Sequence, residues 1–186
     1  KIGRGLIQAA YEMVDGNGGI AVLSATAQAT NQNLWIEWMK KELEENPEKY
    51  ANTPLVKVAY GDDDPTKSTS ETQAQALLTD SSIKVIIAPT TVGMLAAGKV
   101  LQDKQSDVKL TGLGLPSEMA PFIEDGTCPW MYLWNPVDIG YLSGYTMDAL
   151  VKGTITGDVG GSFNAGDLGE KKITEAADGG TEVMLG

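Results

Sequence analysis

The sequence predicts an α/β fold in which a parallel sheet carries helices on both faces, as in a Rossmann or flavodoxin-like lobe. Helical and extended patterns alternate along most of the chain, which is typical of consecutive βαβ units. Residues 83–88 form an almost uninterrupted apolar run, as expected for a parallel strand buried on both faces. The 186 residues contain 42% hydrophobic and 21% charged residues, which is ordinary for a globular protein.

The first elements follow from periodicity and from the residues that end each pattern. Residues 2–13 repeat apolar side chains at helical spacing, and Asn17-Gly18-Gly19 stops the predicted helix. Residues 20–25 are predicted to form a buried strand. Thr30 or Asn31 is expected to cap the next helix, which runs to residue 43 and is followed by a strand over residues 54–60.

Three consecutive aspartates, residues 62–64, follow that strand. A calcium loop would need a glycine at its sixth position and an acidic residue at its twelfth, and this loop has neither. We therefore expect one aspartate to cap a helix whose first residue is Pro65, and the others to favour the positive end of that helix.

The rest of the chain continues the alternation and then changes in composition. After the strand at residues 83–88 we expect a helix over 92–100, a strand over 108–113, a short helix from Ser117, an extended segment over 130–134, and a helix from Pro136. From Gly153 the chain becomes rich in Gly, Asp and Thr. Short strands are predicted at residues 172–175 and 182–185, joined by a turn at 178–180.

Composition excludes several classes of function. A net charge of −11, from 14 basic and 25 acidic residues, argues against binding to nucleic acid. Histidine is absent, and the single cysteine, Cys128, excludes an internal disulfide and a cysteine-based zinc site. We expect Cys128 to be passive and partly buried. There is no phosphate-binding loop and no nucleophile elbow, so we expect no enzymatic activity, no cofactor and no metal.

The expected ligand site lies beyond the carboxyl ends of the parallel strands. The loops there carry Asn31 and Gln32, whose amides both donate and accept hydrogen bonds, as sugar hydroxyls do. Trp134 and Asn135 combine a flat apolar ring with an amide, which suits a pyranose. The alternatives are structural: an asparagine at a helix start is often a cap, and a tryptophan at a strand end is often core. Trp35, Trp38 and Trp130 are expected to serve packing.

Several ordered segments resemble rhamnose-type periplasmic binding proteins of ABC importers, and more distantly the autoinducer-2 receptor and the ribose-binding protein. The resemblance covers essentially the whole chain. It implies two Rossmann-like lobes joined by a hinge, with a monosaccharide held between them. The segments are Ala29-Thr30-Asn31-Gln32-Asn33, Tyr60-Gly61-Asp62-Asp63-Asp64, Ile87-Ala88-Pro89-Thr90-Thr91-Val92-Gly93, Thr111-Gly112-Leu113-Gly114-Leu115-Pro116-Ser117 and Leu133-Trp134-Asn135-Pro136.

The resemblance also implies ligand contacts. The autoinducer-2 receptor has an Asp-Gln contact pair where this chain has Asn31-Gln32, and backbone contacts where it has Pro89, Thr90 and Thr91. The ribose-binding protein has an asparagine contact near Thr90 and a glutamine contact near Asn135. Its cleft aspartate falls near Gly114, so that charged contact is missing here.

By the same resemblance, residues 1–135 are the C-terminal lobe, residues 136–152 are a helix that normally returns to the N-terminal lobe, and residues 153–186 are the hinge and terminal strands. The N-terminal lobe is expected to be absent from this chain. The expected partners are a monosaccharide, the ABC importer membrane subunits and the N-terminal lobe of the same protein. The expected location is periplasmic or anchored to the outer face of the cell membrane, as in a lipoprotein.

The expected ligand is rhamnose or a related deoxyhexose. An autoinducer-2 receptor is one alternative, and Asn31 in place of its carboxylate weighs against it. The effector-binding domain of a sugar-responsive transcription repressor is another, because it shares the fold; a helix-turn-helix ahead of Lys1 would distinguish it. An enzyme is a third alternative, disfavoured by the missing histidine and phosphate loop.

Overall fold

The computed structural model describes residues 2–133, 135–176 and 179–185, which form two compact units. The first unit spans Lys1–Leu133 and the second spans Trp134–Gly186. No helix in the described parts of the chain is both long enough and apolar enough to cross a membrane.

The first unit contains a sheet of four parallel strands in the order β2-β1-β3-β4. This confirms the predicted fold class. The strands are β1 (Gly19–Ser24), β2 (Leu55–Tyr60), β3 (Ile83–Ala88) and β4 (Lys109–Gly112). The helices are α1 (Ile2–Met13), α2 (Thr30–Glu45), α3 (Thr69–Leu77), α4 (Thr91–Asp103) and α5 (Pro116–Glu124).

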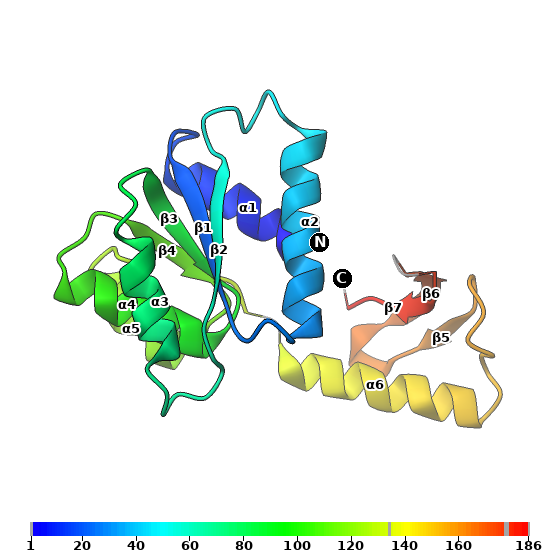
Figure 1. The fold of residues 1–186 in the computed structure, drawn as a ribbon. Helices are drawn as coiled ribbons and strands as arrows, with labels where there is room; N and C mark the ends of the chain where they lie inside the picture. Colours follow the sequence, from blue (N-terminus) through cyan, green and yellow to red (C-terminus); the bar gives the residue numbers. More distant parts are fainter. Residues whose placement is uncertain (1, 134, 177–178, 186) are drawn as a thin grey trace. The chain divides into compact units, whose positions relative to one another are not determined.

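Helices cover both faces of this sheet, with α1 and α2 on one face and α3, α4 and α5 on the other (Figure 1). The strand period of two divides the central side chains between two cores. Ile20 and Val22 of β1 pack with Leu6 and Met39 on the α1–α2 side. Residues 21 and 23 of the same strand pack in the other core, with side chains from α3, α4 and α5. Burial on both faces explains why the central strands lack polar alternation.

Strand β4 approaches β3 so closely that its last residue must lack a side chain. A Cβ atom at Gly112 would lie 1.8 Å from the carbonyl oxygen of Ala88. Beyond this point, residues 130–133 of the segment predicted to be extended form no strand. Tyr132 makes a single parallel bridge to Leu113, and its N–H donates to the Gly112 carbonyl at 2.8 Å. Trp130 and Tyr132 are 37% and 43% exposed, so burial does little to favour a longer strand here.

Two predicted helix starts are also wrong. Helix α2 has Ala29 at its N-cap, without a side-chain cap, and Thr30 is its first residue. Helix α3 begins at Thr69, four residues after Pro65. The reason is local: the Asp64 N–H donates to Asp62 Oδ1 at 2.9 Å, and the Thr66 N–H donates to Asp64 Oδ1 at 2.9 Å. These Asx turns satisfy the backbone before a helix can form.

The second unit combines one helix with a small antiparallel sheet in the order β5-β6-β7. Its elements are α6 (Pro136–Val151), β5 (Ser162–Asn164), the 3₁₀ turn η1 (Gly166–Leu168), β6 (Glu170–Glu175) and β7 (Thr181–Val183). The predicted terminal strand pair is confirmed as β6 and β7; Asp178 of its predicted turn lies outside the described residues. Strand β5 was not predicted. A compact core of this unit is formed by Leu142, Ala149, Ile155, Phe163, Ala165 and Ile173.

Candidate functional site

The strand order β2-β1-β3-β4 puts the topological switch point of the sheet between the carboxyl ends of β1 and β3, and open α/β sheets bind ligands in the crevice expected at that point. The chain leaves β1 toward β2 on one side, then crosses to β3 on the other, so the loops after β1 and β3 diverge. Those loops lead into α2 and α4. The predicted site residues of the first unit, Asn31, Gln32, Pro89, Thr90 and Thr91, all fall in these loops or in the first turn of these helices.

The start of α4 lies directly against the end of β1. A Cβ atom at Gly93 would lie 3.3 Å from the Leu23 carbonyl oxygen and 3.4 Å from Thr90 Oγ1. A side chain at this position would therefore be tightly packed against the end of β1. The structure therefore brings the loop after β3 to the same edge as the loop after β1.

Gln32 is buried, with 4% of its surface exposed, although it was predicted as a ligand contact. Its Oε1 accepts hydrogen bonds from Ser24 Oγ and from the Ala25 N–H, both at 2.8 Å. These bonds join the first turn of α2 to the last residue of β1. Sequence reasoning missed Ser24; the available signal was a hydroxyl that ends an otherwise apolar buried strand.

The other polar side chains of this edge also use their oxygen atoms locally. Asn31 is exposed, and its Oδ1 accepts from the Gln32 N–H at 2.9 Å. Thr90 is the N-cap of α4, and its Oγ1 accepts from the Gly93 N–H at 2.9 Å. Pro89 is buried, and Thr91 is half-buried at the first position of α4. Caps of this kind satisfy N–H groups that a helix leaves free.

The remaining predicted contacts belong to the second unit. Asn135 caps α6: its Oδ1 accepts from the N–H groups of Val137 at 3.0 Å and Asp138 at 3.4 Å. Its Nδ2 donates to Asp138 Oδ2 at 2.9 Å. Trp134 lies outside the described residues. A ligand contact through either residue stays a prediction.

The crevice edge carries amides and hydroxyls, without a group suited to nucleophilic attack. Cys128 is fully buried, and burial raises the pKa of its thiol to about 11. Among the residues that the structure describes, no three His, Cys, Asp or Glu side chains come together in a way that could hold a metal ion. The arrangement can bind a neutral polar molecule through hydrogen bonds.

Gly114, where the resemblance places a lost aspartate, is enclosed. A Cβ atom there would lie 2.8 Å from Met119 Cγ and 3.0 Å from Met131 Sδ. The backbone N–H of Gly114 donates to the Tyr132 carbonyl at 3.3 Å. This position therefore has no room for an acidic side chain in the present packing.

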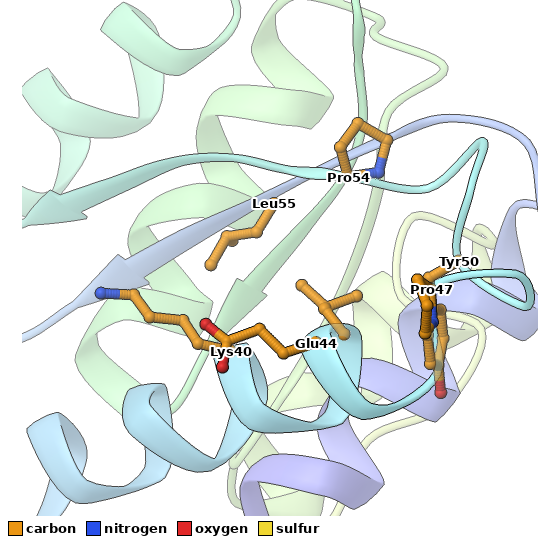
Figure 2. A pocket seen from close by; sticks show the side chains of 7 residues that line it. Lys40, Glu44, Pro47, Tyr50, Pro54 and Leu55 are labelled. Atoms are coloured by element: carbon orange, nitrogen blue, oxygen red, sulfur yellow. The ribbon is translucent and has the colours of Figure 1, made fainter.

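A pocket of about 340 Å³ lies elsewhere, between the end of α2 and the start of β2 (Figure 2). Pro54 and Leu55 mark the amino end of β2, so this pocket lies at the opposite end of the sheet from the crevice. The Tyr50 hydroxyl in its wall already donates to Glu42 at 3.0 Å. Exposed Lys40 and Glu44 border it, together with apolar side chains. It lacks the converging amides of the crevice edge and is not our candidate site.

Comparison with known families decides the identity. A family described as "Periplasmic binding protein domain" matches residues 1–155. The chain belongs to the periplasmic binding protein domain family. Relatives with solved structures are solute-binding and sugar-transport proteins of ABC transporters.

Two solved structures are similar along the whole of this periplasmic binding protein domain. An ABC transporter solute-binding protein from Clostridium phytofermentas, with bound L-rhamnose, is 50% identical with a TM-score of 0.88. A sugar ABC transporter protein from Actinomyces odontolyticus is 40% identical with a TM-score of 0.83. The comparison covers 100% of this chain in both cases, but 60% and 58% of the two solved chains. This chain thus spans less than two thirds of their length.

More distant likenesses show the fold alone. LsrB from Clostridium saccharobutylicum, in complex with AI-2, is 19% identical with a TM-score of 0.77 over 95% of this chain. The similarity confirms the predicted resemblance to that group at the level of architecture.

Proposed function

We propose that this chain forms the C-terminal lobe of an extracytoplasmic solute-binding protein, which captures rhamnose or a related deoxyhexose for an ABC importer. The observation that carries the proposal is the 50% identity, along the entire chain, to a solute-binding protein with bound L-rhamnose. The crevice at the ends of β1 and β3 supports it, because amides and hydroxyls gather there without a catalytic group.

The rest of the site would come from an N-terminal lobe. The solved relatives are considerably longer than this chain, which leaves room for a second lobe in the complete protein. In that arrangement residues 1–135 supply one side of the cleft, and residues 136–152 form the helix that returns to the other lobe. The membrane subunits of the importer would be the second partner, at the periplasm or the outer face of the cell membrane.

Five residues of the first unit and two of the second are proposed as ligand contacts, with residues 89–91 contributing through their backbone. Trp134 would stack on the apolar face of the sugar, and Trp134→Ala should cost about 2 kcal/mol or more of binding free energy. Unchanged affinity in that variant would remove Trp134 from the site. The other proposed contacts are Asn31, Gln32, Pro89, Thr90, Thr91 and Asn135.

Titration calorimetry on the full-length protein tests the function. We expect L-rhamnose to bind with a Kd of about 1 μM, near −8 kcal/mol. D-glucose and D-arabinose serve as comparison sugars, and AI-2 tests the alternative receptor function. Tightest binding to AI-2, or no binding to any monosaccharide, would contradict the proposal.

A further inference from the structure

The hydrogen bonds of Gln32 fix which end of its amide is free. Ala25 can only donate through its backbone N–H, so the side-chain atom 2.8 Å away must be the acceptor, Oε1. The Ser24 hydroxyl donates to the same oxygen, also at 2.8 Å. Both acceptor positions of Oε1 are thereby occupied, and a flipped amide would place its NH₂ against an N–H.

The other end of the amide is available. Gln32 Nε2 has no hydrogen-bond partner among the described residues. Among the described residues, only Thr53 Oγ1 is a side-chain polar atom that is buried without a hydrogen-bond partner, so Gln32 Nε2 is not such an atom. Nε2 therefore keeps contact with solvent, although Gln32 as a whole is only 4% exposed. Gln32 presents two N–H donors and no acceptor.

Neighbouring site residues also have occupied acceptor atoms and free donor groups. The Oδ1 atom of Asn31 accepts from a backbone N–H, which leaves its NH₂ group free to donate. Thr90 Oγ1 accepts from the Gly93 N–H, and its own hydrogen can be donated elsewhere. Three side chains at the edge thus direct their oxygens toward the protein backbone.

We propose that this crevice recognises its ligand as a hydrogen-bond acceptor, and that Ser24 is the positioning residue that sets this polarity by holding Gln32 Oε1. The inference rests on the proposed sugar-binding function. It deepens that function because it names the chemistry of the contact: Gln32 meets a ring oxygen, or a hydroxyl oxygen whose hydrogen is donated to another group. A ligand hydroxyl that must donate at this point is disfavoured, since Gln32 offers no free acceptor.

Gln32→Glu in the full-length protein tests the polarity. The variant keeps one oxygen for Ser24 and the Ala25 N–H, but replaces the free NH₂ with a second acceptor. At pH 8 we expect L-rhamnose affinity to fall at least as far as in Gln32→Ala, by about tenfold or more. As the pH falls and the new carboxyl takes up a proton, it can donate again. Affinity relative to wild type should then recover in Gln32→Glu and stay low in Gln32→Ala.

Two results would overturn the polarity. Gln32→Glu that binds L-rhamnose as tightly as wild type at pH 8 would mean that the ligand donates to this position. Wild-type affinity in Gln32→Ala would mean that Gln32 does not touch the ligand. In both cases wild-type binding itself would leave the sugar-binding function intact, whereas a wild-type protein that binds no monosaccharide would refute the function.

The role of Ser24 is tested with and without sugar. Ser24→Ala should weaken L-rhamnose binding several-fold, and Ser24→Thr, which keeps the hydroxyl, should restore most of it. Without sugar, a double-mutant cycle of Ser24→Ala and Gln32→Met in denaturant unfolding should show coupling between the two positions. Additive effects of the two substitutions on stability would refute the positioning of Gln32 by Ser24, whatever the outcome of the sugar titrations.

Discussion

Arg4 and Glu42 form an ion pair between two helices, with 2.6 Å between Arg4 Nη1 and Glu42 Oε2. They are 38 residues apart in sequence and join α1 to α2 on one face of the sheet. Glu42 also accepts from the Tyr50 hydroxyl at 3.0 Å, and Arg4 contacts Glu45 in addition. The Glu42 side chain is nearly buried, so this contact secures the helix that carries Asn31 and Gln32.

Glu42→Gln should lower the free energy of unfolding by about 1–3 kcal/mol at pH 7. Burial alone raises the pKa of Glu42, but the hydrogen bonds from Arg4 and Tyr50 and the charge of Arg4 outweigh it, so the pKa lies below its ordinary 4.5. A lowered folded-state pKa means that the stabilisation is complete above about pH 4.5 and is lost as the pH falls through the folded value. The variant and the wild type should therefore converge in acid.

Urea unfolding between pH 3 and pH 8 measures this difference. Exposed Glu48 provides the control, because Glu48→Gln removes the same charge without a buried partner. A stability difference that persisted unchanged at pH 3 would show that the Glu42 charge is not its source.

Gly112→Ala should destabilise the first unit by at least about 2 kcal/mol, because overpacking against a backbone atom has no easy relief. The added methyl would meet the Ala88 carbonyl at 1.8 Å. Gly5→Ala is the matched control: nothing lies within 4 Å of a Cβ at this position inside α1. That control should stabilise by about 0.5–1 kcal/mol. Equal effects of the two changes in thermal unfolding would contradict the close approach of β3 and β4.

Asn135 caps α6 in the structure and is also a predicted ligand contact, and two variants separate these roles. Asn135→Ala removes the cap of α6 and should cost about 1 kcal/mol of stability. Asn135→Ser keeps a capping oxygen but removes the amide, so stability should be largely retained while L-rhamnose affinity falls. If the serine variant binds sugar normally, the cap is the whole function of Asn135.

Cys128 should resist thiol reagents in the folded protein. Its thiol is fully buried and its pKa is raised to about 11, so the reactive thiolate is scarce at pH 8. Labelling should follow unfolding, with a rate that rises with urea. Labelling of the native protein as fast as a free thiol would contradict the burial.

The sequence predicted the main elements well because helical spacing repeats apolar residues regularly, and because a strand buried on both faces, such as Ile83–Ala88, leaves a nearly continuous apolar run. The predicted helix start at Pro65 was wrong. There the side chains of Asp62 and Asp64 accept hydrogen bonds from backbone N–H groups two residues further on, which competes with helix capping. The sequence prediction also missed β5, whose three residues are too short to show a period.

For the candidate site, the sequence placed Asn31, Gln32 and residues 89–91 after β1 and β3, where the structure has them, but it did not predict their hydrogen bonds. The amides of Asn31 and Gln32 read equally as donors and acceptors along the chain. Their polarity depends on where Oδ1 and Oε1 find backbone N–H groups after folding. A hydroxyl at the end of a buried apolar strand marked Ser24 as unusual, but its partner, Gln32, is set only when α2 packs against the end of β1.

Gly114 is enclosed by Met119 and Met131, and this limits which ligand specificities the first unit could acquire by mutation. The resemblance to the ribose-binding protein implies an acidic ligand contact near this point. Here Gly114→Asp alone would place a carboxylate against two thioether side chains, and the carboxylate would lose its hydration. To accommodate the aspartate, Met119 and Met131 would first have to be replaced by smaller residues. Each such replacement would destabilise the core to which α5 contributes. The packing of Met119 and Met131 thus restricts which side chains can stand at position 114, independently of any contact with a ligand.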